Sequence, residues 1–284
     1  MSSVIDAHFH LWQVGRHGFE WPTPDLTAIY RDFASSDLCA AAGGALHGAV
    51  VVQSQPSDAD TQWLLRLAET DPLIMGVVGW TDLSAPDAAA RVDGLALQPK
   101  LKGLRPMLQG LPDDNWILRP DVAPALSAMQ TAGLVFDALV FTRHLPAIEA
   151  VAQRYPDLRI VIDHAAKPPI ATTQTQPEAT REWTQTMTAI ARQPNVVCKL
   201  SGLFTEMHID QPLHEAAPYV AHLLTVFGPQ RLLFGSDWPV VRLNGDWQKW
   251  RHWLEDQLNP LTSSERQAIF FTNAKRIYDL QGVQ

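Results

Sequence analysis

Two histidines near the start of the chain have the spacing of a shared metal or oxyanion site. His8 and His10 lie in Val4–His10, where apolar residues indicate a β-strand. Residues two apart in a strand point to the same side, so the two imidazoles project together. Such a pair can bind one divalent metal ion or donate jointly to one oxygen. Taken alone, a His-x-His pair is equally compatible with ordinary surface or core histidines.

Two later segments place polar residues directly after apolar runs. Asp163 and His164 follow the run that ends at Ile162, and Asp237 follows the run that begins at Leu232. Polar groups that leave a buried strand must be paired or functional. A carboxylate at such a strand end is a natural general base. Asp237 is therefore a candidate catalytic base, and His164 is a candidate partner of His8 and His10.

A further set of residues could contact a substrate. Arg105 could hold a carboxylate or hydroxyls through its planar guanidinium, although a structural ion pair is an equal alternative. The same two alternatives apply to Lys199, which stands near the end of the seventh apolar run. One amide and three aromatic side chains suit a pocket for a compact hydroxylated ring, with core packing as the alternative: Gln53, Trp12, Trp80 and Trp238.

The elements that must position these residues alternate regularly along the chain. Eight apolar runs with little polar alternation predict strands that are buried on both faces, as in a parallel sheet. They are Val4–His10, Ala49–Gln53, Ile74–Trp80, Gly103–Met107, Leu134–Ala138, Arg159–His164, Val196–Ser201 and Leu232–Asp237. Amphipathic stretches separate them, and one of these begins at Ser57 with Asp60 in the position of a capping box. Eight such repeats predict a (β/α)8 barrel.

The rival arrangement, a doubly wound open sheet, uses the same units. Its nucleotide-binding versions lose support, because the first strand is not followed by GxGxxG and the chain has no GxxxxGK[ST]. No linker divides the sequence, so we expect one domain over residues 1–284. In a closed barrel the eighth strand lies beside the first, which would set Asp237 opposite His8 and His10. The loops Arg16–Thr27 and Pro169–Pro177 should lie on the same face.

The composition is that of an ordinary globular protein. Of the 284 residues, 46% are hydrophobic, and the formal net charge of -8 offers no basic field for nucleic acid. No stretch approaches the roughly 18 apolar residues of a membrane span. The first residues lack the basic and apolar segments of a signal peptide, so we expect a cytoplasmic protein. Cys39 and Cys198 are far apart and predict two buried, reduced thiols.

Five motifs, in order along the chain, resemble one family. IDAHFHLW, KGLRP, VIDHAAKP, CKLSG and LLFGSDWPV resemble the amidohydrolase-2 group of the amidohydrolase superfamily, and within it the sugar-lactonase branch. The resemblance runs from Val4 to about Leu280. It implies a barrel whose site lies at the strand C-termini. It also implies that one set of residues provides the catalytic or metal-binding groups: His8, His10, His164 and Asp237.

The chain departs from this pattern at two strand ends. Binuclear relatives carry a bridging lysine at strand four and a histidine at strand five, where this chain has Arg105 and Asp137. The resemblance therefore implies one divalent metal ion such as zinc, or none, rather than two. It leaves the roles of Asp137 and Asp163 open, and the sequence leaves open whether the chain forms a homo-oligomer.

The hypothesis that follows is hydrolysis of a sugar aldonolactone, such as L-fuconolactone or a related 1,4- or 1,5-lactone. Asp237 would take a proton from water, and the imidazoles or one metal ion would hold the oxyanion. The alternatives are a metal-dependent decarboxylase, a pyrone-dicarboxylate lactonase, an amide or ester hydrolase, and a non-catalytic sugar-binding barrel. A dicarboxylate would need several arginines, but only Arg105 stands at a strand end, with Arg143 in a nearby loop.

Overall fold

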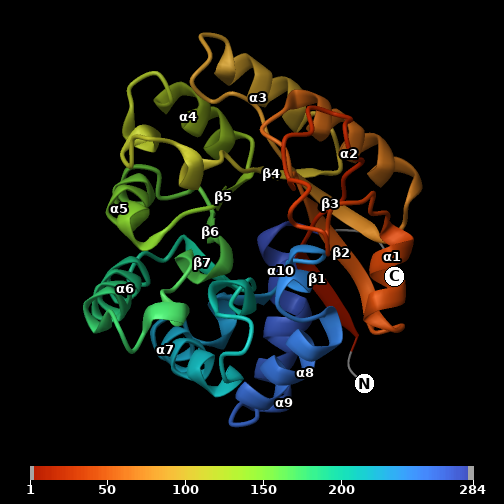
Figure 1. The fold of residues 1–284 in the computed structure, drawn as a ribbon. Helices are drawn as coiled ribbons and strands as arrows, with labels where there is room; N and C mark the ends of the chain where they lie inside the picture. Colours follow the sequence, from red (N-terminus) through yellow and green to blue (C-terminus); the bar gives the residue numbers. More distant parts are fainter. Residues whose placement is uncertain (1–2, 281–284) are drawn as a thin grey trace.

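The eight predicted strands form one parallel sheet (Figure 1). The computed structural model describes residues 3–280, so both ends of the predicted domain, residues 1–2 and 281–284, lie outside the described part. Each strand pairs in parallel with the next one along the chain. They are β1 (Val4–Phe9), β2 (Leu46–Val52), β3 (Ile74–Gly79), β4 (Leu101–Leu104), β5 (Val135–Ala138), β6 (Ile160–Ile162), β7 (Val196–Leu200) and β8 (Leu232–Phe234).

Backbone hydrogen bonds close the sheet into a barrel. The amide of His10 donates to the carbonyl of Trp238 over 2.7 Å, and the amide of Asp237 donates to the carbonyl of His8 over 2.8 Å. Phe9 and Trp238 form a parallel bridge between these bonds. The first strand and the segment after the eighth are thereby joined, and the predicted (β/α)8 barrel is confirmed.

Helices follow the strands and cover the outside of the barrel. They are α1 (Ser35–Ala42), α2 (Asp58–Thr70), α3 (Ala88–Ala96), α4 (Ala123–Thr131), α5 (Leu145–Arg154), α6 (Pro177–Ile190), α7 (Ala217–Phe227), α8 (Trp247–Gln257), α9 (Ser263–Gln267) and α10 (Asn273–Ile277). A π-helical turn, Ala268–Thr272, joins the last two. No helix within residues 3–280 has both the length and the apolar character that crossing a membrane requires.

Two details of the sequence prediction are wrong. Ser57 does cap α2, but the carboxylate of Asp60 accepts hydrogen bonds from the amides of Ser54 and Gln55 at 3.0 and 3.3 Å, so no capping box forms. Cys198 is buried and Cys39 is exposed, because Leu38 and Ala42 form the buried face of α1. Both thiols are free.

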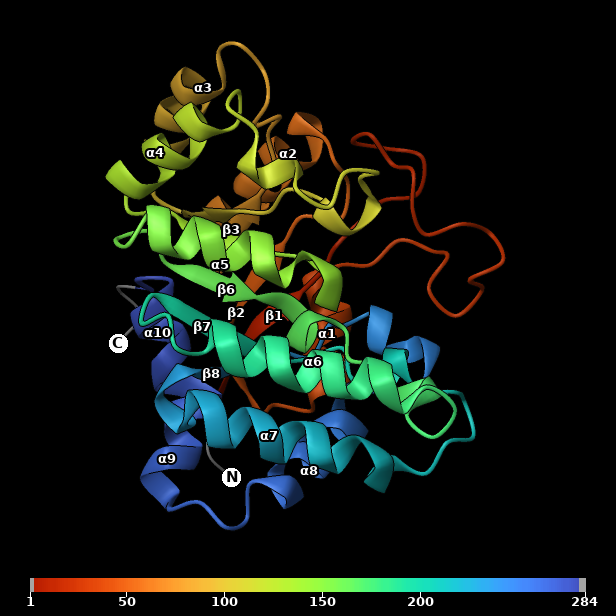
Figure 2. The same ribbon diagram turned by 90° about the vertical axis from the view of Figure 1, so that its left-hand side faces the viewer.

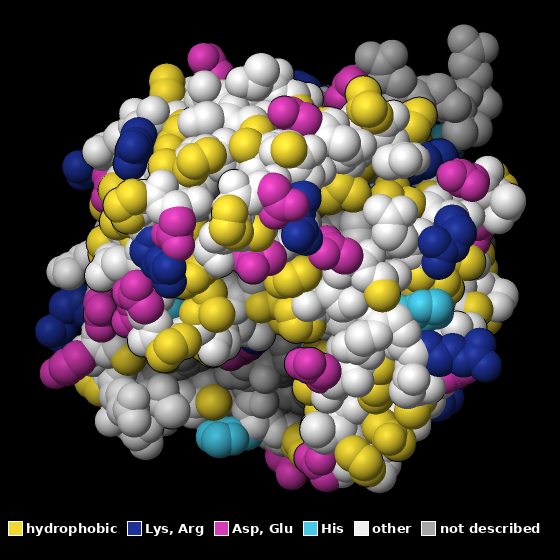
Figure 3. Space-filling model, turned by 90° about the horizontal axis from the view of Figure 1, so that it is seen from above, with side chains coloured by type: hydrophobic (Ala, Val, Ile, Leu, Met, Phe, Trp, Pro, Cys, Tyr) yellow, Lys and Arg dark blue, Asp and Glu magenta, His cyan; other side chains and the backbone are white. Residues whose placement is uncertain are grey.

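The two ends of the barrel differ. Apolar side chains of the strands, such as Ile5, Val50 and Val161, pack inside the barrel against Ile277 and Tyr278 of the C-terminal segment. Figure 2 shows α10 at this end of the barrel, and the long loop after β1 projects at the other. On the face seen from above α3, acidic, basic and apolar side chains are interspersed (Figure 3). The strand C-termini are thus the end left to build a polar site.

Candidate active site

Four predicted residues converge at the carboxyl ends of three strands. Nε2 of His8 lies 3.0 Å from Nε2 of His10. Oδ1 of Asp237 lies 3.4 Å from Nε2 of His10 and 3.7 Å from Nε2 of His8. Nε2 of His164 lies 3.8 Å from the same carboxylate oxygen. All four side chains are buried. The structure therefore brings together groups that the sequence separates by most of the chain.

The position of His8 depends on Asp6 and on a glycine. Asp6 accepts hydrogen bonds from the amide of His8 at 3.2 Å, from the amide of Ser236 at 2.8 Å and from the indole of Trp247 at 2.9 Å. It ties β1 to the segment that carries Asp237. Gly235 lies against His8, where an added Cβ would come within 2.7 Å of the histidine Cβ. Only glycine allows this close approach.

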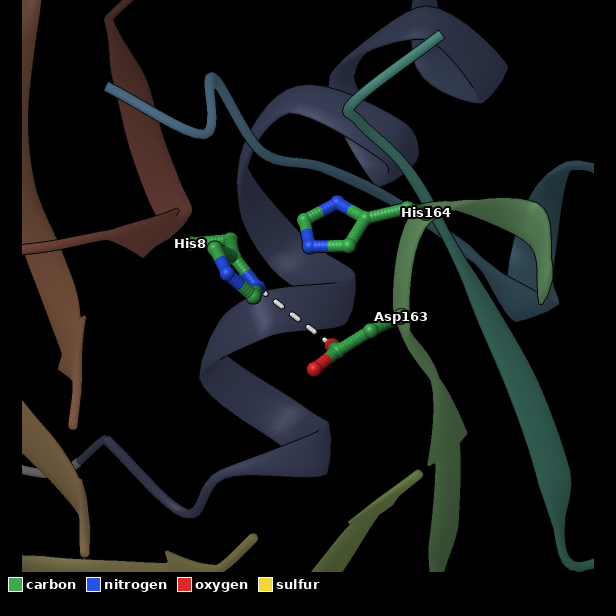
Figure 4. A group of neighbouring side chains, drawn as sticks. All are labelled: His8, Asp163 and His164. Carbon is green, nitrogen blue, oxygen red and sulfur yellow. Dashed lines mark ion pairs between the residues drawn. The ribbon is translucent and has the colours of Figure 1, made fainter. Parts of the chain in front are cut away.

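His164 begins a left-handed turn. His164, Ala165, Ala166 and Lys167 all have φ between 51° and 56°, a conformation that is unfavourable for residues with a Cβ. The turn reverses the chain directly after β6. Nδ1 of His164 lies 2.9 Å from Oγ of Ser201, which fixes the ring. Figure 4 shows the ring of His164 beside His8, while Asp163 points toward His8 from below.

A buried group of charges lies beneath this cluster. Nζ of Lys199 lies 2.9 Å from Oδ1 of Asp163 and forms a second ion pair with Asp137. It also lies 3.2 Å from Nδ1 of His8. The hydroxyl of Tyr278 donates to Asp137 over 2.9 Å. The lysine predicted as a substrate contact is therefore enclosed between two carboxylates, and the structure does not bring it to the cavity.

Burial and neighbouring charges act in opposite directions on the carboxyl groups. Burial raises the pKa of Asp137 to about 6, although Lys199 opposes this effect. Burial would also raise the pKa of Asp163, but attraction to Lys199 and His8 holds it well below its usual value. Burial likewise opposes ionisation of Asp237, but the nearby His164 and a hydrogen bond with His10 lower its pKa below its usual range. Asp163 and Asp237 are thus carboxylates at neutral pH.

The imidazoles respond mainly to burial. Burial lowers the pKa of His164 to about 4, against the opposing attraction of Asp237 and Asp163. It also holds the pKa of His8 well below its usual value, against the attraction of Asp163. Both rings are therefore neutral near pH 7, the form that binds metal ions and accepts protons.

A cavity of about 500 Å³ opens over the cluster. His10, His164 and Asp237 line it, and so does Arg105, whose guanidinium lies 3.5 Å from Asp163. The other predicted substrate contacts do not line it. Trp12 and Trp238 pack against Phe33 in the core, and Trp80 is half-buried beside Thr61. Gln53 is buried and donates to the carbonyl of Arg105.

Loops supply much of the cavity wall. Glu20, Trp21 and Gln55 line one part of it, and Lys167 lines another. Met107 and Gln109 follow β4 and complete a mixed polar and apolar surface. Sequence reasoning placed the loop Arg16–Thr27 on the correct face but did not single out these side chains, because a loop has no periodicity that indicates which residues face inward.

A comparison with protein families agrees with this geometry. The family model described as Amidohydrolase matches residues 5–280. The chain belongs to the amidohydrolase family. The resemblance carried by the five motifs is thereby confirmed, and the convergent groups of this amidohydrolase occupy the barrel end where the family resemblance places its site.

Relatives of this amidohydrolase include two curated lactonases. An L-fucono-1,5-lactonase of Burkholderia ambifaria is 46% identical over 98% of this chain and 96% of the relative. An L-fucono-1,5-lactonase of Burkholderia multivorans is 34% identical over 97% and 96%. The resemblance to the sugar-lactonase branch is confirmed by these two. A solved amidohydrolase from Burkholderia multivorans with bound zinc has a TM-score of 0.90 and 33% identity, covering 99% of this chain and 100% of that one.

The donor set of this amidohydrolase suits a divalent cation. Nδ1 of His10 lies 2.8 Å from the carbonyl of Val52 and must donate to it, so the Nε2 lone pair faces His8 and Asp237. Ligand atoms of His8, His10 and Asp237 all lie within 4.8 Å of one another. Two nitrogens 3.0 Å apart can both lie at the zinc–nitrogen distance of about 2.0–2.1 Å.

A second group of possible metal ligands suits a metal ion less well. It consists of His8, Asp163 and His164 (Figure 4). The ammonium of Lys199 already lies 2.9 Å from the Asp163 carboxylate and balances its charge. We therefore assign a candidate divalent metal site to His8, His10 and Asp237, with His164 beside it.

Proposed function

We propose that this amidohydrolase hydrolyses L-fucono-1,5-lactone, or a closely related sugar lactone, to the aldonic acid. The observation that carries the proposal is the convergence of Asp237 with three imidazoles, two of which, those of His10 and His164, line the cavity. The 46% identity to a relative named L-fucono-1,5-lactonase supports the choice of substrate.

In this proposal, Asp237 orients a water molecule and accepts its proton. The water oxygen attacks the lactone carbonyl, and a tetrahedral oxyanion forms. The bond to the ring oxygen then breaks, and the proton held by Asp237 passes to that oxygen. Water and lactone are thereby converted into one hydroxy acid. His8 and His10 would stabilise this charge by holding a divalent metal ion, since Nε2 of His10 carries a lone pair and cannot donate to an oxyanion. His164 lies beside that site, 3.8 Å from the Asp237 carboxylate.

The chemistry that zinc would supply is Lewis-acid polarisation of the carbonyl. His8, His10 and Asp237 would hold the ion. Asp163 would accept a hydrogen bond from Nδ1 of His8, which lies 3.3 Å away, and so orient the ring. Ser201 would hold His164 in the same way.

The cavity supports a neutral substrate rather than a dicarboxylate. Its two cationic side chains are already engaged, since Arg105 pairs with Asp163 and Lys167 lies 3.7 Å from Glu206. Arg143 is bound to Asp114 and does not line the cavity. Few charges are left to bind ligand carboxylates, while apolar residues such as Trp21 and Leu139 can contact a sugar ring.

The direct experiment is a panel of lactones assayed by acid release with a pH indicator, with and without chelator. Rapid hydrolysis of L-fucono-1,5-lactone is the expected result. Faster turnover of a pyrone dicarboxylate, or carbon dioxide release from an aromatic acid, would replace the proposal with one of its alternatives. Lactone binding without turnover would indicate a sugar-binding barrel.

A further inference from the structure

One part of the cavity wall is hydrogen-bonded to the barrel through the side chain of Gln55. Gln55 is buried, and its Oε1 accepts hydrogen bonds from the amides of Glu20 and Trp21 at 2.8 and 3.3 Å. Its Nε2 donates to the carbonyl of Trp21 over 2.7 Å. Three hydrogen bonds thus fix the backbone of two residues that line the cavity.

Gln55 is itself held in place. The carboxylate of Asp60 accepts hydrogen bonds from the amides of Ser54 and Gln55, and Nε2 of Gln55 also donates to Oγ of Ser54 at 2.9 Å. The ring of Trp12 packs edge-on against Trp21 at 5.6 Å between centroids. The loop is therefore held at a defined position above the reaction centre.

Glu20 differs from the other ionisable residues of the wall. His10, Arg105, His164, Lys167 and Asp237 each have an ion pair or hydrogen bond. Within residues 3–280, the carboxylate of Glu20 has no such partner, although its backbone is bound to Gln55. Glu20 is exposed and lines the cavity, so its carboxylate is available to a ligand there.

The proposed reaction changes the charge of the ligand, so the carboxylate of Glu20 affects the binding of substrate and product differently. The lactone is neutral, whereas the product is a carboxylate with a net charge of about −1 at neutral pH. A carboxylate in the wall can accept hydrogen bonds from the hydroxyls of either ligand, but it repels only the product. Like charges about 4 Å apart in water-like surroundings change affinity by about fivefold.

We propose that Glu20, positioned by Gln55, is a specificity-determining residue that favours neutral polyhydroxylated lactones over ligands bearing a carboxylate. It thereby also weakens binding of the aldonate product. This inference rests on the proposed function, since it assumes a lactone substrate.

The test compares Glu20→Gln with wild type for two quantities: the KM of L-fucono-1,5-lactone and the dissociation constant of L-fuconate, measured by calorimetry. Glu20→Gln should raise the KM two- to threefold, because the amide is a weaker acceptor of the ligand's hydroxyls. It should tighten L-fuconate binding about twofold, because the same loss partly offsets the fivefold gain from the removed repulsion, so the ratio of KM to the L-fuconate dissociation constant should rise about fivefold. The tightening should shrink at high salt. Glu69→Gln, an exposed change on α2 with the same effect on net charge, is the matched control and should alter neither quantity.

Gln55→Met provides a second variant that keeps the charge of Glu20. Loss of its three hydrogen bonds to Glu20 and Trp21 should also tighten L-fuconate binding and raise the KM, while kcat stays within a fewfold of wild type. The inference is overturned if Glu20→Gln keeps the wild-type ratio of KM to the L-fuconate dissociation constant while wild type hydrolyses the lactone. Absence of lactone turnover by wild type would instead remove the proposed function.

Discussion

Nζ of Lys199 lies 3.2 Å from Nδ1 of His8, on the side of the imidazole opposite the cavity. Asp163 approaches the same nitrogen to 3.3 Å. The ammonium can donate to Nδ1, or the carboxylate can accept from it. The second arrangement leaves the Nε2 lone pair available for a metal ion. The charges of Lys199 and Asp163 thus decide whether Nε2 of His8 carries a hydrogen or a lone pair.

The first prediction concerns this buried lysine. Lys199→Met leaves Asp137 and Asp163 without their shared cation in a site that water does not reach. We expect the free energy of unfolding to fall by about 3–5 kcal/mol, measured by denaturant titration. Lys249→Met, an exposed change on α8, is the control. A loss below about 1 kcal/mol would show that the charge group does not stabilise the fold.

Lys199 also illustrates where sequence reasoning reaches its limit. Apolar runs predict strands, and adjacency of the first and last strands predicts that Asp237 meets His8. Neither pattern indicates how deep in the barrel the side chain of a strand residue lies. The sequence therefore did not indicate that Lys199 lies beneath the site. Nor did it indicate that Trp12 and Trp238 pack in the core. Glu20 and Gln55 were missed because their contact depends on how two loops fold against each other.

A second prediction concerns closure of the barrel at Asp6. Its two oxygens accept hydrogen bonds from Ser236, His8 and Trp247. Asp6→Asn replaces one acceptor with an NH₂ group that faces a donor. The free energy of unfolding should fall by about 2–4 kcal/mol, with a matching drop in Tm. The control is Asp246→Asn, at the N-terminus of α8, which should lower the free energy of unfolding by less than about 1 kcal/mol. Equal losses in the two variants would contradict this account of closure.

The third prediction is the pH dependence of turnover. Burial lowers the pKa of His164 to about 4, so the ring gains a proton only in strong acid. If neutral His164 is needed, kcat/KM should stay level from about pH 8 to about pH 5 and fall as pH drops through about 4. If the pKa of this imidazole were unperturbed, kcat/KM would instead fall near pH 6.5. An inflection near that value, with the fold intact by circular dichroism, would contradict this role of His164.

Metal binding supplies the fourth prediction. Titration of metal-free protein with zinc, followed by calorimetry, should give about one equivalent per chain. His10→Ala removes one of three ligands and should weaken zinc affinity at least 100-fold. His252→Ala, at an exposed position on α8, should bind as wild type does. Unchanged zinc affinity in His10→Ala would place any bound metal elsewhere.

The measurement that tests the central claim most directly is kcat/KM of Asp237→Asn with L-fucono-1,5-lactone. The variant keeps the size of the side chain but cannot accept a proton from water. We predict a fall of at least 1,000-fold, with the circular dichroism spectrum and Tm close to those of wild type. A folded variant that retains more than about a tenth of the wild-type kcat/KM would contradict the assignment of Asp237 as the base.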